Sequence, residues 1–175
     1  MKKTLYITSG APGAGKTTFV DERIDALGGL HIARDEIRLS LLSPGEYYFK
    51  NEHKVFDTFI KKIQKAIDSR FGANDIYIDA THLNSRSRHK VLNKLNLSNV
   101  DKIVVLWFDI PLKVLLERNI DEKGKERVPA SAIETMVKSM DEPDKNECWH
   151  KPFEIWRIDQ EGWIEEVKSK LIKCL

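Results

Sequence analysis

Residues 10–17 have the types and spacing of a phosphate-binding loop. They read Gly-Ala-Pro-Gly-Ala-Gly-Lys-Thr and match G-x-x-x-x-G-K-[ST] at every fixed position. Glycines permit a backbone path on which successive N–H groups point at one phosphate. Lys16 adds positive charge for the β- and γ-phosphates, and Thr17 offers a hydroxyl to Mg²⁺. The sequence therefore predicts a nucleoside triphosphate site made of Gly10, Ala11, Pro12, Gly13, Ala14, Gly15, Lys16, Thr17 and the adjoining Thr18.

A second set of reactive side chains follows the apolar run 30–33. Phosphoryl transfer depends on positioning and charge neutralisation, so the useful groups are acids and cations at the ends of strands. Asp35 stands at such an end, and we predict that it takes the proton of an acceptor hydroxyl. Arg38 follows on the same helical face, where its forked donors suit a phosphate on the acceptor. The alternative is a helix N-cap at Asp35 beside a surface arginine.

A further acid, Asp79, closes the apolar run 76–78. A carboxylate at a strand end beside a phosphate-binding loop is suited to hold Mg²⁺ or its waters. We therefore predict a metal site made by Thr17 and Asp79. The polar loop that follows leads into a helix with Arg86 and Arg88, and either arginine reaches the acceptor or faces water.

The segment of about residues 120–128 is polar, contains a glycine and ends before a proline. This composition is typical of a mobile charged loop, and we predict a lid that closes over the nucleotide. Arg118, before the lid, and Arg127, at its end, are predicted to bind the nucleotide and stabilise charge on the transferred group. Lys123 and Lys125 are the competing cations of the same loop.

The loop 44–51 carries three consecutive aromatic residues, Tyr47, Tyr48 and Phe49. One hypothesis is that they stack on a nucleic-acid base. The other is that they pack over the long helix predicted next in the chain. Packing is the favoured interpretation, because large aromatic side chains are mostly buried.

The composition fits one domain over residues 1–175, since 41% hydrophobic residues can bury a core of that size. The 29 basic and 27 acidic residues leave a formal net charge of +2, which does not by itself indicate nucleic acid. Cations gather only locally, in residues 61–65 and 86–90, as a nucleic-acid contact or as solvated helix faces. Cys148 and Cys174 lack metal-ligand spacing, and no signal peptide or membrane segment is evident. We therefore expect a cytoplasmic protein with reduced thiols and no membrane partner.

Apolar runs with strand character alternate with helix-compatible segments along the chain. This alternation predicts a parallel sheet covered by helices on both faces. We expect an α/β fold, a three-layer sandwich of the P-loop NTPase type with a five-stranded parallel sheet and the mobile lid. The predicted strands are 4–8, 30–33, 75–79, 102–108 and 153–158, and the predicted helices are 17–27, 35–42, 51–70, 85–95, 111–119, 129–140 and 161–172.

Taken together, these motifs resemble the kinase domain of bacteriophage-type 5′-hydroxyl polynucleotide kinases. The order and spacing extend from the first strand to about Met140. Besides the phosphate-binding loop, the motifs that carry the resemblance are Arg34-Asp35-x-x-Arg38, Asp79-x-Thr81-x-Leu83-Asn84, Phe108-Asp109-x-Pro111, Glu117-Arg118-Asn119 and Arg127-Val128-Pro129.

The resemblance implies that Lys16 and Thr17 serve the ATP phosphates and Mg²⁺. It also implies that Asp35 activates the 5′-hydroxyl and that Arg38 contacts the phosphate on the acceptor's 3′ side. A lid arginine on the ATP phosphates is assigned to Arg127, with Lys123 as the alternative match. The chain shows no D-x-D-G-T motif of the phosphatase domain found in the bifunctional phage enzyme, so phosphate removal is not expected.

We therefore expect a kinase, with ATP and Mg²⁺ as cofactors, that transfers the γ-phosphate to the 5′-hydroxyl end of RNA or DNA. A kinase of a small molecule or modified nucleoside is the alternative enzyme, because the nucleotide machinery does not separate the two. An alternative of another class is a nucleotide-binding regulatory ATPase or switch. The oligomeric state is not readable from the sequence.

Overall fold

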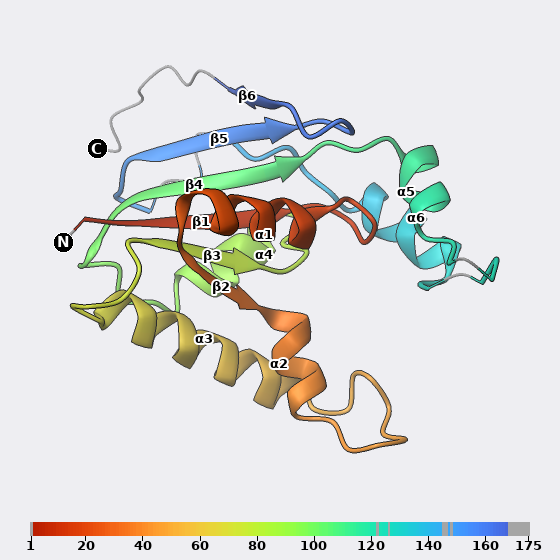
Figure 1. The fold of residues 1–175 in the computed structure, drawn as a ribbon, viewed down its shortest axis with the longest axis horizontal. Helices are drawn as coiled ribbons and strands as arrows, with labels where there is room; N and C mark the ends of the chain where they lie inside the picture. The colour runs from red at the N-terminus through yellow and green to blue at the C-terminus, as the bar shows by residue number, and fades with distance from the viewer. Residues whose placement is uncertain (1, 122, 126, 145–146, 148, 168–175) are drawn as a thin grey trace.

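The protein is described from a computed structural model, over residues 2–121, 123–125, 127–144, 147 and 149–167. Strands and helices alternate along most of the chain (Figure 1). The strands are β1 (Lys3–Ser9), β2 (Leu30–Ala33), β3 (Asp75–Asp79), β4 (Val100–Phe108), β5 (Phe153–Ile158) and β6 (Ile164–Glu166). The helices are α1 (Lys16–Leu27), α2 (Arg34–Ser40), α3 (Glu52–Asp68), α4 (Ser85–Leu92), α5 (Leu112–Arg118) and α6 (Ala130–Lys138).

One sheet forms the centre of the fold, with the strand order β2-β3-β1-β4-β5-β6. The strands β1 to β5 are parallel, and β6 pairs antiparallel with β5. Parallel strands end at the same edge of a sheet, so the loops that follow β1, β2, β3 and β4 meet there. This edge positions the phosphate-binding loop, Asp35 and Asp79, whereas Arg118 and Arg127 lie at and beyond the end of α5.

Alternate residues of the central strands feed two hydrophobic clusters. In β1, Leu5 and Ile7 belong to one cluster and Tyr6 belongs to the other. In β3, Ile76 belongs to the first cluster and Tyr77 to the second. Successive side chains of a strand point to opposite faces, so these strands are apolar on both sides and need helices on both. That requirement produces the three layers.

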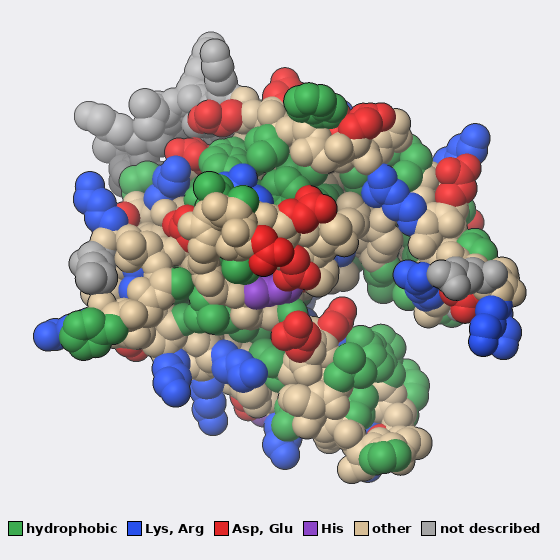
Figure 2. Space-filling model, viewed as in Figure 1, with side chains coloured by type: hydrophobic (Ala, Val, Ile, Leu, Met, Phe, Trp, Pro, Cys, Tyr) green, Lys and Arg blue, Asp and Glu red, His purple; other side chains and the backbone are tan. Residues whose placement is uncertain are grey.

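Helix α3 shows how the first face is covered. Its buried positions Val55, Phe59, Ile63 and Ile67 recur every four residues and make one apolar stripe. The rest of the helix surface carries the exposed Lys54, Lys61, Lys62 and Lys65, of which Lys62 and Lys65 border a groove beside β2. Basic side chains gather on this lower side of the molecule in Figure 2. The cationic stretch 61–65 is thus a solvent-facing surface of α3.

The predicted α/β three-layer fold is confirmed, with a correction at the C-terminal end. The sheet has six strands and is mixed, because β6 turns back on β5 where the sequence pattern predicts a helix over 161–172. Asp159 accepts hydrogen bonds from the N–H groups of Glu161 and Trp163, at 3.0 and 2.9 Å, and Gly162 has φ 83°. These contacts build a turn in place of a helix start. The predicted helical residues 168–172 lie outside the described residues, as do Cys148 and Cys174.

Within the described part of the chain, no helix combines the length and the apolar character needed to cross a membrane.

Candidate active site

The phosphate-binding loop joins β1 to α1. Gly13 and Gly15 have φ angles of 81° and 84°, in the left-handed region that favours glycine. A Cβ atom on Gly10 would lie 2.9 Å from the Cβ of Phe108, so this position excludes a side chain. The N–H of Gly10 donates to the Thr81 carbonyl at 2.9 Å, which ties the loop to the end of β3. The loop therefore fits a cradle of N–H groups at the positive end of α1.

Lys16 begins α1, and its ammonium donates to the Ala11 carbonyl at 2.8 Å. In the part of the chain that the structure describes, this is the one hydrogen bond of Nζ, and an ammonium group has three donors. Burial lowers the pKa of Lys16 below its ordinary value, against the opposing charges of Asp79 and Asp35. Two donors of a desolvated cation thus remain for a phosphate, and the Asp35 charge acts on this same cation.

Asp79 joins the loop to the two strands beside it. Its carboxylate accepts hydrogen bonds from Thr17 Oγ1 at 2.8 Å and from Thr8 Oγ1 at 3.0 Å. Burial raises the pKa of Asp79, but its hydrogen bonds and the nearby Lys16 charge outweigh that effect, so the pKa lies below its ordinary value. The structure therefore brings the two predicted metal ligands into direct contact: the ionised carboxylate of Asp79 and the neutral hydroxyl of Thr17.

His31 is a residue of this site that the sequence analysis does not identify. Its Nε2 lies 3.2 Å from Asp79 Oδ2, and its Nδ1 lies 2.9 Å from Asp21 Oδ1. The hydrogen bond to Asp79 raises the pKa of His31, with further contributions from the charges of both acids. No local motif marks His31, because only the pairing of β2 with β3 places it beside Asp79.

Asp35 and Arg38 form an ion pair across the first turns of α2. The Asp35 side chain is 75% exposed, whereas the Arg38 side chain is 8% exposed. Arg38 Nε also donates to Glu52 Oε1 at 2.7 Å. Burial by itself lowers the pKa of Arg38, but its hydrogen bonds to Glu52 and its other partners have the larger, opposite effect. The pKa of Arg38 therefore lies above its ordinary value. The buried guanidinium of Arg38 is therefore fixed by Glu52 and contacts the exposed carboxylate of Asp35. These are the two residues that the sequence predicts to act on the acceptor.

Glu52, the first residue of α3, is a second contributor that no motif reveals. Its other carboxylate oxygen accepts a hydrogen bond from Arg34 at 2.8 Å. One acid thus positions both arginines of α2 from a different helix. The sequence signal is weak, since Glu52 lies 14 residues from Arg38 and reads as an ordinary acidic residue in the first turn of a helix.

The two predicted lid arginines face one cavity of about 460 Å³ beside the phosphate-binding loop. Its lining includes Gly13, Gly15 and Thr18 of the loop region together with Arg118 and Arg127. Lys123 and Lys125 do not line it, and their N–H groups instead donate to the side chain of Asp121. Arg127 thus lines the cavity at the loop, whereas the backbone of Lys123 and Lys125 forms a turn around Asp121 with both residues exposed.

The turn between β5 and β6 closes the opposite wall of this cavity. Residues Asp159, Gln160, Glu161 and Gly162 line it. Arg118 donates to the Gln160 carbonyl at 2.7 Å, which fixes the guanidinium between the turn and the loop. This wall is not predicted from the sequence, because the predicted helix over 161–172 would replace the turn at this position.

Arg88 does not reach the acceptor, contrary to one interpretation of the sequence. Its side chain is fully buried, and it donates to Glu147 Oε2 at 2.7 Å and to Asp141 Oδ1 at 2.7 Å. It also donates to Ser9 Oγ at 3.2 Å. Arg88 therefore joins α4 to the segment that follows α6, while Arg86 on the same helix is exposed.

His82, which follows β3, is buried with an unusual backbone conformation. Its φ is 36°, and its Nδ1 lies 2.9 Å from the Thr8 carbonyl oxygen. A carbonyl only accepts hydrogen bonds, so the proton resides on Nδ1 and Nε2 is unprotonated. The buried Nε2 has no hydrogen-bond partner among the described residues. Burial lowers the pKa of His82 to about 4.

We expect His82 to lower the free energy of unfolding by about 2 kcal/mol between pH 7 and pH 5. Its native pKa of about 4 lies below the ordinary value of 6.5, so the unfolded chain binds a proton in this window and the native chain does not. Urea unfolding at both pH values should show a smaller loss for His82→Asn, since Asn tolerates positive φ.

The control for this prediction is His53→Asn, because the His53 side chain is 92% exposed. It should keep the full loss of stability seen in the parent protein. An identical loss in the parent and in both variants would show that His82 does not carry the effect.

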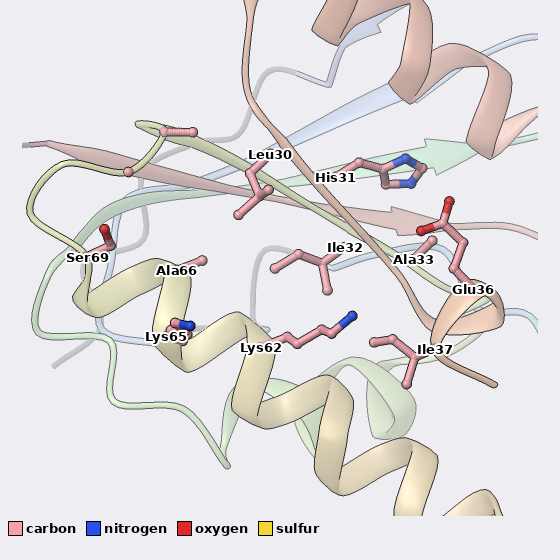
Figure 3. A pocket seen from close by; sticks show the side chains of 12 residues that line it. Leu30, His31, Ile32, Ala33, Glu36, Ile37, Lys62, Lys65, Ala66 and Ser69 are labelled. Carbon is pink, nitrogen blue, oxygen red and sulfur yellow. The ribbon is translucent and has the colours of Figure 1, made fainter. Parts of the chain in front are cut away.

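A second cavity, of about 340 Å³, lies between β2 and α3 (Figure 3). Leu30, Ile32 and Ile37 face α3 across it, and Lys62 extends along it from the helix. None of the predicted site residues lines this cavity. His31, which contacts Asp79, lines this groove as well, so the groove adjoins the candidate site through that one side chain.

Comparison with known proteins agrees with this geometry. A family model described as an AAA domain matches residues 5–143, which contain the phosphate-binding loop and every predicted site residue. A chain in the structure of the Pnkp1/Rnl/Hen1 RNA repair complex is 29% identical, with a TM-score of 0.62. The match covers 78% of this chain and 43% of that one, so the protein spans less than half of that chain's length.

Two further structures are similar in fold. A fungal RNA kinase is 16% identical with a TM-score of 0.63, over 97% of this chain and 79% of that one. A gluconokinase from Sinorhizobium meliloti 1021 is 17% identical with a TM-score of 0.55, over 87% and 82%. The fold is therefore that of P-loop kinases, and it is shared by a kinase of RNA and by a kinase of a small molecule.

Proposed function

The chain belongs to the AAA domain family, and from this premise we propose that it is an ATP- and Mg²⁺-dependent kinase of the 5′-hydroxyl ends of RNA or DNA. One observation carries the proposal: the accessible acid Asp35 follows β2 and Lys16 follows β1, so both lie at the same edge of one parallel sheet. A phosphate held by Lys16 and a hydroxyl beside Asp35 would thus meet at one sheet edge. Phosphoryl transfer requires positioning, charge neutralisation and a proton acceptor. Lys16 would neutralise charge, and Asp35 would accept the proton.

In the proposed reaction, the acceptor oxygen forms a bond to the γ-phosphorus. The bond between that phosphorus and the bridging oxygen of the leaving diphosphate breaks, and the Asp35 carboxylate takes the hydroxyl proton. Arg38 holds Asp35 through their ion pair and keeps donors for a phosphate on the acceptor. The Lys16 ammonium stabilises the negative charge on the phosphates throughout the transfer.

Thr17 and Asp79 are the residues that would hold Mg²⁺, which when bound neutralises charge on the phosphates. The described residues contain no group of three acids, His or Cys that would form a protein-only metal cage. Mg²⁺ commonly takes one or two carboxylates and completes its shell with substrate phosphates and waters. An ionised Asp79 in contact with the Thr17 hydroxyl fits that requirement.

Arg127 is the proposed lid cation, together with Arg118. Both line the cavity at the loop, and a Cβ on Gly15 would lie 3.9 Å from an Arg118 guanidinium nitrogen. Lys123, the alternative match, is exposed and does not line this cavity. Closure of the lid would bring Arg127 onto the phosphates and exclude water from the transfer.

A polynucleotide acceptor is favoured by Arg38 and by the similarity to a chain of the RNA repair complex. A charge-assisted pair between a buried guanidinium and a phosphate is specific for an acceptor that carries phosphate. A small-molecule acceptor is the second candidate, since the gluconokinase has the same fold.

One assay separates these candidates. The protein is incubated with γ-labelled ATP, Mg²⁺ and either 5′-hydroxyl oligonucleotides or a panel of small hydroxylated metabolites. Label on oligonucleotide ends is the expected result. Label on a metabolite alone, or release as free phosphate alone, would overturn the proposal in favour of a small-molecule kinase or a regulatory ATPase.

We expect Arg38→Ala to raise the KM for a 5′-hydroxyl oligonucleotide by about 10- to 100-fold, the worth of a hydrogen bond to a charged group. The KM for ATP should change less than about twofold, because the donor side keeps Lys16 and the loop. Arg34→Ala is the matched control, since it removes the other arginine on Glu52 and leaves the contact to Asp35. Equal increases in both KM values would contradict an acceptor-phosphate contact.

A further inference from the structure

Tyr47, Tyr48 and Phe49 form one cluster of rings beside Arg38. The centroids of Tyr48 and Phe49 lie 4.9 Å apart, and those of Tyr47 and Phe49 lie 5.8 Å apart, both in edge-to-face arrangements. The Arg38 guanidinium lies 4.7 Å from the centroid of the Tyr48 ring and donates to its hydroxyl oxygen at 3.2 Å. These rings are thus attached to the acceptor arginine and form what we term the aromatic platform.

The platform is exposed, which corrects the expectation that these rings pack over α3. Tyr47 is 71% exposed, Phe49 50% and Tyr48 38%. None of the three belongs to either hydrophobic cluster of the described residues. Figure 2 shows hydrophobic surface on the lobe made by α2 and the loop after it, beside a hollow that opens toward the lid. Contiguous exposed apolar surface of this kind marks a binding site.

Resting on the proposed function, we propose that the aromatic platform stacks the leading nucleobases of a single-stranded acceptor. Arg38 would take the phosphate after the first nucleoside, and the rings lie directly against this guanidinium. The base attached beside that phosphate then meets a ring face. The platform thereby selects acceptors that carry a flat base, in addition to the hydroxyl that Asp35 serves.

A nucleobase is the occupant that matches the chemistry of this surface. Every base presents a π-face, so stacking on aromatic side chains is tolerant of sequence. The Arg38 guanidinium lies against the Tyr48 and Phe49 rings, so one surface offers a cation for a phosphate and apolar rings for the base next to it. A sugar acid offers carboxylate and hydroxyl groups but no flat apolar face, so it leaves the three rings uncovered.

The test uses the intact protein and an octanucleotide in which the base is removed at position 1, 2 or 6. With the parent protein, loss of a base at position 1 or 2 is expected to raise the KM by about tenfold, and loss at position 6 to have no effect. Tyr47→Leu and Phe49→Leu should raise the KM for the complete octamer by about tenfold and leave that for the abasic ends unchanged.

A binding measurement makes the test independent of catalysis. Fluorescence anisotropy of a 3′-labelled octamer with a 5′-deoxy end, which lacks the reactive hydroxyl, should show the same loss of affinity in both variants. Phe71→Leu is the matched control, since Phe71 is 97% exposed and follows the far end of α3. This control should bind like the parent.

The outcomes distinguish the two proposals. If no oligonucleotide is phosphorylated by the parent, the proposed function fails whatever the anisotropy shows. If octamers are phosphorylated with equal KM with and without the leading bases, the platform assignment is overturned and the function stands. A change in sedimentation of Tyr47→Leu with unchanged base dependence would assign the surface to self-association and also overturn it.

Discussion

Replacing Asp35 with Asn is expected to lower kcat for transfer to a 5′-hydroxyl by about 10²- to 10⁴-fold, the usual contribution of a general base. Asn keeps the size and the position of the carboxylate but cannot accept the proton. The Asp35 side chain is 75% exposed and makes no contact with the phosphate-binding loop that is needed for its shape. ATP binding should therefore remain within about twofold of the parent value, as measured by calorimetry or by competition with a fluorescent nucleotide.

Glu36→Gln provides the matched control for this experiment. Glu36 is the next residue of α2, is exposed, and lines the groove between β2 and α3. The same neutralisation of charge there should leave kcat unchanged. If Asp35→Asn transfers phosphate as fast as the parent, another group takes the proton and the assignment of Asp35 is wrong.

Replacing Arg88 with Met is expected to lower the free energy of unfolding by about 3–5 kcal/mol, the cost of leaving a buried ion unpaired. Glu147 is 5% exposed, and Arg88 meets both of its carboxylate oxygens. Met fills a similar volume, so the loss comes from the stranded carboxylate rather than from a cavity. Urea unfolding followed by circular dichroism at pH 7 measures this loss directly.

Two further variants identify the cause. Arg86→Met changes an exposed arginine of the same helix and should alter the free energy of unfolding by less than about 0.5 kcal/mol. Adding Glu147→Gln to Arg88→Met should recover part of the loss, because the amide carries no charge to strand. Equal stability of Arg88→Met and Arg86→Met would show that the buried network contributes little.

Features encoded in short segments were predictable from the sequence. The phosphate-binding loop is a motif of eight consecutive residues, and Gly13 and Gly15 have the positive φ angles that favour glycine. The strands β2, β3 and β5 match the predicted bounds 30–33, 75–79 and 153–158, because a buried strand is a short apolar run. Asp35, Arg38 and Asp79 were found as strand-end residues, since parallel strands share one functional edge.

Other features depended on contacts between distant segments. The partners of Arg88 lie 59 and 53 residues away, so the pattern around residues 86–90 does not reveal which arginine is buried. Likewise, three consecutive aromatic residues look like core, and only the path of the loop between α2 and α3 leaves them exposed beside Arg38.

The sequence by itself thus determined the phosphate-binding loop and the start of α1, where residues 10–18 lie, because backbone conformation and motif chemistry are local properties. The tertiary structure decided how the strands are ordered, which brings His31 to Asp79, Glu52 to Arg38 and the β5–β6 turn to Arg118. Each of these contacts joins residues from different elements, so it forms only when the folded chain brings those elements together. Local periodicity carries no information on such pairings, which is why the contacts of Glu52 and His31 and the β5–β6 wall of the cavity beside the phosphate-binding loop emerged only from the structure.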